Sequence, residues 1–485
     1  LSGVQALGNH STKVWVDCSG ALLRDEDTTK LFSPRELLGK SYLCGTLQHY
    51  TRMRGREIIQ NSGHTAAFSV VASILQHLRF VIGLDTSVQS MGVSVISKNF
   101  QEQWQSHFST QQISLSPELA CIILPCYYDL QKRSILPHFP SIRRALCWHA
   151  NAVKSFRDSI IELVQESQAI ESNNHNITSV SIGRVLTQRI ENIKNILRQA
   201  DCILVFAGAG MSVSSGIPDI TSFSAAFPAM VQRGVDSIFK ASSHSHFTDM
   251  PESAWGFWGA RAKSYASVAP DDSYTQLLQM CKNAGKYFVC TSNIDRFFAR
   301  AGFDENLMLE IHGSLFDLQC ENSECPEPVE RKNHQFFLNP DNIQVDEQQW
   351  VISDSSMIPK CSNCGLNKRI ATELAMDGHL VKDLITEQRR NYKQFLRGIS
   401  TSDSVVVLEL GCGVIMSKLR EQASRFTRVR ALSERSGCVS GFTKHIRINP
   451  THWEMDSHTP SANCIALPLA ADLVLQYLAN TNETS

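Results

Sequence analysis

The sequence predicts a doubly wound α/β fold, a Rossmann-like parallel sheet covered by helices on both faces, for residues 181–482. Short apolar runs recur along this part of the chain, they are continuous rather than alternating, and helix-length segments separate them. Continuous apolar runs are typical of strands buried on both faces, as in a parallel sheet between two helix layers. The expected strands are Ile203–Phe206, Tyr287–Thr291, Ser404–Leu410 and His445–Asn449.

An amphipathic helix is expected just before the first of these strands, because apolar residues recur there every three to four positions. They are Ile182, Val185, Leu186, Ile190, Ile193 and Leu197. The polar stretch upstream is rich in Asn and Ser and has no helical period, so we interpret residues 167–180 as a linker between two domains.

Residues 1–166 are expected to form a smaller α/β domain, because 485 residues are too many for one ordinary domain. The chain begins at Leu1 without a Met, so we expect that upstream sequence is missing. Residues 24–80 fit no assignment. The remaining strand candidates are Lys13–Asp17, Gly92–Ser97 and Cys121–Pro125, and a closing helix carries Val153, Phe156, Ile160 and Leu163 on one face.

The composition is that of an ordinary globular protein, with 42% hydrophobic and 19% charged residues. Lys and Arg number 46 against 47 for Asp and Glu, which argues against a general nucleic-acid binder, and no specific nucleic-acid partner is expected. No apolar run is long enough to span a membrane. Four of the 15 Cys residues are clustered, which suits reduced thiols and a bound metal, so we expect a cytoplasmic or nuclear location.

The first motif is a glycine-rich turn directly after the first expected strand, within Phe206–Asp219 (FAGAGMSVSSGIPD). Gly208 and Gly210 let a backbone approach a pyrophosphate closely, and the start of a following helix offers free N–H groups. Ser212, Ser214 and Ser215 add hydroxyl donors. On its own, a Gly-x-Gly turn would equally predict a simple tight turn.

The second motif follows the next expected strand, where Asn293 and Asp295 precede His312 by a short distance in the chain. A lone His is more often a core or surface residue than a catalyst. An unperturbed imidazole nevertheless titrates near neutrality, which suits a general base. The amide and the carboxylate could hold and orient a ligand at the strand end.

The third motif is a set of four cysteines in two closely spaced pairs, Cys320 with Cys325 and Cys361 with Cys364. Two such pairs can place four thiolates tetrahedrally around Zn²⁺, in a closed structural site with no open position for chemistry. The alternative is four unrelated buried cysteines. The stretch between the pairs is unusually long for such a module, which we expect over residues 316–370.

The fourth motif consists of polar and glycine residues after the last two expected strands. Gly411 and Gly413 follow one strand, and Asn449 ends the other. Each feature alone is common, since Gly often follows a strand. Their order after the first three motifs is what gives them weight.

Taken together, the four motifs resemble the sirtuin family, nearest to its macrodomain-associated and bacterial-like members. The resemblance implies a structural zinc ion and NAD as co-substrate. It also implies catalytic roles: Asn293 holds a water or the ribose, Asp295 orients the nicotinamide amide, and His312 takes a proton from a ribose hydroxyl. The implied NAD-binding residues are Ala207, Gly208, Gly210, Ser212, Pro218, Asp219, Ser292, Asn293, Asp295, Gly411, Gly413 and Asn449.

The sequence also departs from the family pattern. Ile220-Thr221 stands where the family has Phe-Arg beside the nicotinamide pocket, and Ser292 replaces a common Gln. The usual Gly-Thr-Ser motif is Gly411-Cys412-Gly413. Residues 365–380 lack the family pattern that builds the acyl-lysine groove. These changes leave NAD binding better supported than protein deacetylation.

Residues 1–166 show a fainter resemblance, to a TIR domain that lacks its first strand. NAD-cleaving TIR domains carry a Glu four residues after a Trp, and here Phe108 takes that position after Trp104. The resemblance implies an assembly or signalling module without NADase activity. An unrelated α/β domain is the alternative.

The sirtuin resemblance implies a transferase that cleaves the nicotinamide–ribose bond of NAD and passes ADP-ribose to an acceptor. The acceptor would be an acyl-lysine (deacylase) or a protein side chain (ADP-ribosylation). The alternatives are an NAD hydrolase and a non-catalytic sensor of NAD or ADP-ribose in a TIR-linked immune signalling protein. Expected partners are NAD and a protein or acyl-lysine substrate, with self-association through the N-terminal domain.

Overall fold

The computed structural model describes most of the C-terminal part of the chain, which begins with helix α8 (Ser179–Arg198). The described ranges are 179–217, 223, 227–326, 330–331, 345–372, 374–375, 377–380, 383–414, 417–450, 452–455 and 459–480, together with 114–115 and 176–177. The expected strands and helix within residues 1–166 lie outside these ranges, as does the TIR-like assignment.

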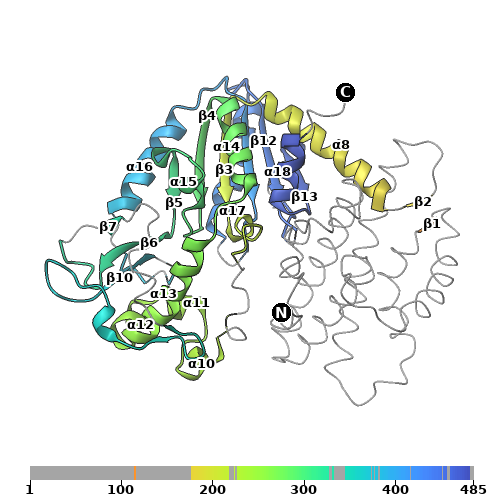
Figure 1. The fold of residues 1–485 in the computed structure, drawn as a ribbon. Coiled ribbons are helices and arrows are strands. Elements are labelled where there is room, and N and C mark those ends of the chain that lie inside the picture. Colours follow the sequence, from red (N-terminus) through yellow and green to blue (C-terminus); the bar gives the residue numbers. More distant parts are fainter. Residues whose placement is uncertain are drawn as a thin grey trace, which may run out of the picture.

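A parallel sheet of six strands forms the centre of the described fold, in the order β13-β12-β11-β3-β4-β5 (Figure 1). The four strands expected within residues 181–482 are present, with ends shifted by one or two residues, and two more complete the sheet. The strands are β3 (Cys202–Ala207), β4 (Lys286–Thr291), β5 (Met308–Glu310), β11 (Val405–Leu410), β12 (Thr443–Ile448) and β13 (Cys464–Leu467).

Both faces of the sheet are buried, which explains why its strands are apolar throughout. Along β3, Ile203 and Val205 belong to one hydrophobic core. Leu204 and Phe206 belong to a second core on the opposite face. Successive side chains of a strand point to opposite faces, so a strand between two cores has no polar face. The prediction of a doubly wound α/β fold is confirmed.

The helices that cover the sheet divide between its faces. Helix α8 packs with α14 (Asp272–Ala284) and α18 (Ala471–Asn480) over the first core. Helices α16 (Asp383–Arg397) and α17 (Lys418–Arg435) contribute to the second core, through residues such as Ile385 and Leu419. The apolar face predicted for α8 is confirmed by its buried residues Val185, Leu186, Ile190, Ile193 and Leu197.

A smaller lobe lies below the sheet in Figure 1. This lobe contains an antiparallel sheet of three strands in the order β10-β6-β7. The strands are β6 (Gly313–Cys320), β7 (Glu330–Arg331) and β10 (Lys368–Thr372). The helices are α10 (Pro228–Gln232), α11 (Ile238–Ala241), α12 (His244–Asp249) and α13 (Pro251–Ser267).

Part of the long insertion between the two cysteine pairs forms a hairpin of β8 (Val345–Asp346) and β9 (Val351–Ile352). The hairpin packs against α13. A Cβ atom at Gly256 would lie 2.5 Å from the backbone of Trp350, so only glycine allows this approach. The insertion therefore contributes to the packing of the smaller lobe.

Short elements complete the described fold. They are β1 (Ser114–Leu115), β2 (Asn176–Ile177), η5 (Ala209–Met211), α15 (Phe297–Arg300), η6 (Glu305–Leu307), η7 (Ser355–Met357) and η8 (Ser461–Asn463). Strands β1 and β2 pair with each other, so the end of the predicted linker 167–180 takes part in a parallel bridge. Within the described ranges, no helix is long and apolar enough to cross a membrane.

Candidate functional site

The predicted site residues lie at the carboxyl ends of neighbouring strands. In the sheet register Ala207 is opposite both Thr291 and Leu410, and Leu410 is opposite Ile448. The motifs that follow β3, β4, β11 and β12 therefore emerge at the same edge. This edge is where ligands of open α/β sheets bind.

The glycines of the first and fourth motifs allow two turns to touch. A Cβ at Gly208 would lie 2.7 Å from Cys412 Cα, and one at Gly210 would lie 2.7 Å from Gly411 Cα. Gly411 has a φ of +59°, a conformation that side chains disfavour. Gly210 donates a backbone hydrogen bond of 3.0 Å to the Gly411 carbonyl. These glycines are thus required by the fold itself, whatever ligand the turns bind.

Gly413 and Asn449 lie at the same strand ends but in different surroundings. Among the residues that the structure describes, none has an atom within 4 Å of a Cβ placed at Gly413. The Asn449 amide donates a 2.8 Å hydrogen bond to the Cys412 carbonyl, and its oxygen accepts one of 3.3 Å from the His452 N–H. Asn449 therefore connects the segments that follow β11 and β12.

Ser212, Asn293 and Asp295 form one buried hydrogen-bonded cluster. The Ser212 hydroxyl lies 2.6 Å from Asp295 Oδ2 and donates to it. The Asn293 amide donates to Ser212 Oγ at 2.8 Å and to the Gly208 carbonyl at 3.0 Å. The glycine-rich turn and the end of β4 are therefore held together by side chains that the sequence predicts as ligand contacts.

Burial changes the ionisation of this cluster. Burial raises the pKa of Asp295 to about 6, although hydrogen bonds from Ser212 and the Phe297 N–H oppose the rise. Burial also raises the pKa of Tyr274 well above its ordinary value, and its hydroxyl lies 3.1 Å from Ser212 Oγ. Tyr274 is a member of the cluster that the sequence did not predict, because no local pattern connects it with the motifs.

The hydroxyls of Ser214 and Ser215 are directed away from this cluster. Both donate to Asp271 Oδ2, at 2.5 and 2.8 Å. Asp271 is the N-cap of α14 and also accepts from the Ser273 N–H at 2.8 Å. The sequence suggested both serines as ligand donors, whereas in the structure they attach the turn to α14.

His312 lies in the turn between β5 and β6 and is buried, with 3% of its surface exposed. Its neighbour Ile311 donates a backbone hydrogen bond of 2.9 Å to the Thr291 carbonyl, and Leu315 donates one of 2.9 Å to Ile294. Gly313, which follows it, has a φ of +74° and packs against the Ala371 carbonyl. These contacts place the His312 turn beside the Asn293–Asp295 segment.

A sharp turn after Asp295 is held by ion pairs. Arg296 is a non-glycine residue in the left-handed region, with a φ of 62°. Its guanidinium lies 2.6 Å from Glu310 and 2.8 Å from Glu305. The ion pairs bring the end of β5 next to the end of β4.

The remaining predicted NAD contacts are placed in part. The Ser292 N–H donates to the Ala207 carbonyl at 3.1 Å, so these two backbones are adjacent. Pro218 and Asp219, with the unusual Ile220-Thr221 that follows, lie outside the described residues.

The four predicted zinc ligands come together in the smaller lobe. The sulfur atoms of Cys320, Cys325, Cys361 and Cys364 all lie within 4.8 Å of one another. Cys320 and Cys364 are 3.4 Å apart, and Cys325 and Cys361 are 3.7 Å apart. Zinc–sulfur bonds of about 2.3 Å imply sulfur separations of about 3.8 Å in a tetrahedron. The donor set therefore fits a structural zinc ion, as predicted.

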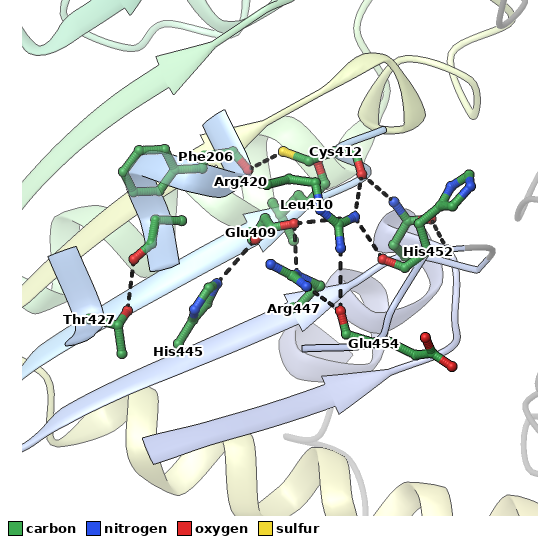
Figure 2. A network of polar contacts seen from close by, with 12 residues as sticks. Phe206, Glu409, Leu410, Cys412, Arg420, Thr427, His445, Arg447, His452 and Glu454 are labelled. Carbon is green, nitrogen blue, oxygen red and sulfur yellow. Dashed lines mark hydrogen bonds and ion pairs between the residues drawn. The ribbon is translucent and has the colours of Figure 1, made fainter. Parts of the chain in front are cut away.

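A second buried polar network lies near the carboxyl ends of β11 and β12 (Figure 2). The Glu409 carboxylate lies 2.9 Å from the Arg447 guanidinium and 3.1 Å from His445 Nε2. Burial favours a raised pKa of Glu409, but the hydrogen bond from His445 and the charges of Arg447 and Arg420 outweigh it and lower the pKa. The sequence did not predict this network, because an apolar strand pattern gives no sign that its few charged residues, such as Glu409 and Arg447, are buried and meet one another.

Comparison with known proteins matches residues 208–407 to the Sir2 family. An "NAD-dependent protein deacylase" of Daphnia pulex is 26% identical over 188 residues, which cover 36% of this chain and 64% of the relative. A "Protein ADP-ribosyltransferase" of Staphylococcus aureus is 26% identical over 236 residues, covering 47% and 70%. A solved Sir2 homolog–NAD complex aligns with a TM-score of 0.42 and 18% identity, covering 60% of this chain and 92% of that one.

The chain thus spans less than two thirds of the Daphnia deacylase. The family match confirms the resemblance that the motifs predicted for the C-terminal part. It does not extend to residues 1–166, so the TIR-like resemblance and the signalling role remain without support.

Proposed function

From the sirtuin domain in the C-terminal part of this chain, we propose an enzyme that cleaves the nicotinamide–ribose bond of NAD and transfers ADP-ribose to an acceptor. One observation supports this most strongly. Asn293, Asp295 and Ser212 form one buried cluster at the strand ends, next to the glycine-rich turn and to the turn that carries His312. A buried polar cluster with a raised carboxyl pKa, at the sheet edge where ligands of such folds bind, marks a candidate functional site.

The nucleotide would lie along the carboxyl edge of the sheet. The turn through Gly208 and Gly210 would receive the pyrophosphate, where glycine permits close approach to backbone N–H groups. The segments at Gly411–Gly413 and Asn449 would receive the adenosine half. Ala207, Ser212, Pro218, Asp219 and Ser292 complete the proposed contacts.

The chemistry would use the cluster as follows. Cleavage of the bond to nicotinamide builds positive charge on the ribose, and Asp295 would orient the departing amide. Asn293 would hold the ribose or a water. His312 would accept a proton from a ribose hydroxyl as the acceptor attacks, a role that typically accounts for about 10²–10⁴-fold in rate.

Zinc would act only on the fold. The ligands would be Cys320, Cys325, Cys361 and Cys364, and four thiolates leave no coordination position for a substrate. Strand β6 begins at Gly313, directly after His312, and ends at Cys320, and it pairs with β10. The metal would thereby stabilise the lobe that places His312.

The acceptor is proposed to be either an acyl-lysine or a protein side chain. One matching relative is named a deacylase and another an ADP-ribosyltransferase. The match to the ADP-ribosyltransferase covers the larger share of this chain, 47% against 36%. Residues 365–380 lack the pattern expected of an acyl-lysine groove. This departure favours ADP-ribosylation of a protein.

Two other functions remain as proposals for the same site. Water as the acceptor would make the protein an NAD hydrolase. A site that binds NAD or ADP-ribose without turnover would make it a sensor, and the altered pair Ile220-Thr221 after Asp219 favours that function. Self-association through residues 1–166 and a cytoplasmic or nuclear location stay predictions.

Product analysis of the full chain tests these proposals together. The protein would be incubated with NAD in three reactions, with an acyl-lysine peptide, with a non-acylated protein mixture, and in buffer alone. Deacylation yields nicotinamide and acyl-ADP-ribose, side-chain transfer yields ADP-ribosylated protein, and hydrolysis yields free ADP-ribose. NAD binding without nicotinamide release in all three reactions would support the sensor and contradict the enzyme.

A further inference from the structure

Arg420 of helix α17 connects two separate segments at the carboxyl edge of the sheet (Figure 2). Cys412 follows β11, and the Arg420 guanidinium donates to its carbonyl at 3.0 Å. His452 and Glu454 follow β12, and the same guanidinium donates to their carbonyls at 2.7 and 3.3 Å. A planar guanidinium has five donors in fixed directions, so it can hold several carbonyls in a defined arrangement.

The same two segments are joined by further side chains. The Asn449 amide donates to the Cys412 carbonyl that Arg420 also binds, at 2.8 Å. Arg447, from β12, donates to the Glu454 carbonyl. The backbone that follows β11 is thus held by Arg420 of α17 and by Asn449, the residue directly after β12.

The charged groups of Glu409, Arg420 and Arg447 are buried inside the fold. Glu409 is 1% exposed and lies 3.8 Å from the Arg420 guanidinium and 2.9 Å from Arg447. Burying such groups costs free energy that apolar residues would not cost, so a charged network rarely improves stability over apolar packing. What it provides here is a fixed position for Arg420 and for the carbonyls that it binds.

We propose that Arg420 is a positioning residue for the adenosine half of NAD. It acts through the Cys412 carbonyl and the segment 452–454, without touching the nucleotide. The inference rests on the proposed function, in which Gly411–Gly413 and Asn449 bind the adenosine half. Segments that are ordered before binding lose less conformational entropy when the ligand arrives, which strengthens binding.

Helix α17 also supplies a matched control. Arg430 makes the same kind of contact at the opposite edge of the sheet, donating to the carbonyls of Ser400 at 3.0 Å and Asp403 at 2.5 Å. These residues precede β11, whereas the Arg420 acceptors follow the strand ends. R430Q therefore removes two hydrogen bonds of the same kind from the same helix, against three for R420Q, at the edge of the sheet opposite to the proposed nucleotide.

The test compares the parent with R420Q, R420K and R430Q in the full chain. We expect R420Q to raise the Kd and KM for NAD about tenfold, because the ligand would then have to order the segments that Arg420 holds in the parent. The kcat for nicotinamide release should change by less than about twofold, because the reacting groups are untouched. R430Q should also lower the Tm but leave the Kd within about twofold of the parent.

R420K keeps a positive charge beside Glu409 and loses the planar fork, so it tests the geometry even if R420Q does not fold. An increase in Kd of several fold at a near-parental Tm supports the inference. An unchanged Kd in R420K or in folded R420Q overturns it, as does an equal loss of affinity in R430Q. A parent protein that binds no NAD would instead overturn the proposed function, and this inference with it.

Discussion

The hydroxyl of Ser212 donates a hydrogen bond of 2.6 Å to the carboxylate of Asp295, although 83 positions separate them in the chain. The contact joins the glycine-rich turn after β3 to the end of β4. Ser212 also accepts from the Asn293 amide at 2.8 Å, so one hydroxyl connects two predicted catalytic residues. The geometry of the site therefore depends on a side chain from the turn that is proposed to bind the pyrophosphate.

Replacing Ser212 with Ala should weaken the site more than the fold. Asp295 would lose a hydrogen bond that lowers its pKa, and we expect nicotinamide release to fall by at least about tenfold. Ser214→Ala is the matched control, because its hydroxyl donates to Asp271 instead. Steady-state kinetics should show near-parental activity for Ser214→Ala. Equal losses in the two variants would contradict a specific role for Ser212.

The ionisation of Asp295 should be visible in the stability of the protein. Its pKa rises from 3.8 in the unfolded chain to about 6 in the folded one. The folded protein therefore holds a proton that the unfolded chain releases, and stability falls by about 3 kcal/mol through this group as pH rises across that range. Asp295→Asn removes the buried charge. Urea unfolding should show the variant gaining stability over the parent between pH 4 and pH 6, whereas a pH-independent difference would argue against the raised pKa.

Two glycines at the same edge should respond differently to substitution by Ala. Gly208→Ala forces a Cβ to within 2.7 Å of Cys412 Cα, and the resulting backbone shift should cost about 1–3 kcal/mol of stability. The new Cβ of Gly413→Ala meets no atom within 4 Å in the described part of the chain, so the Tm of this variant should stay near that of the parent. If a nucleotide approaches this backbone, Gly413→Ala should still weaken NAD binding. Calorimetric titration and thermal unfolding of both variants separate the two effects, and unchanged NAD affinity in Gly413→Ala would remove it from the site.

Zinc should be required for the fold of the smaller lobe. We expect one zinc ion per chain, with Cys361→Ser losing it and lowering the free energy of unfolding by several kcal/mol. Cys438→Ser is the control, because Cys438 is exposed and lies outside the cluster. Elemental analysis and thermal unfolding provide the readouts. Full zinc content in Cys361→Ser would show that these four cysteines are not the ligand set.

The sheet was predictable from the sequence because burial on both faces leaves a local signature. Every residue of β3 is buried, and the apolar run Ile203–Phe206 reports this directly. The cysteine pairs were predictable for a similar reason, because two cysteines a few positions apart in the chain can both bind one metal ion. In both cases neighbouring residues carry the information.

The sequence could not assign partners to polar residues that meet across the fold. Ser214 and Ser215 looked like ligand donors, yet Asp271, more than fifty positions away, accepts both hydroxyls. Likewise, nothing in the local pattern connects Arg420 with Glu409 or identifies Tyr274 as a neighbour of Ser212. Such pairs depend on how the helices and turns are placed by the completed sheet.

Nicotinamide release from NAD by the full chain is the most direct test of the central proposal. The parent should release nicotinamide in the presence of an acceptor. His312→Ala should lose about 10²–10⁴-fold of that rate while its Kd for NAD stays within a few fold, because a general base contributes little to ground-state binding. Parent protein that binds NAD but releases no nicotinamide with any acceptor would contradict the account, and full activity in His312→Ala would contradict the role given to that residue.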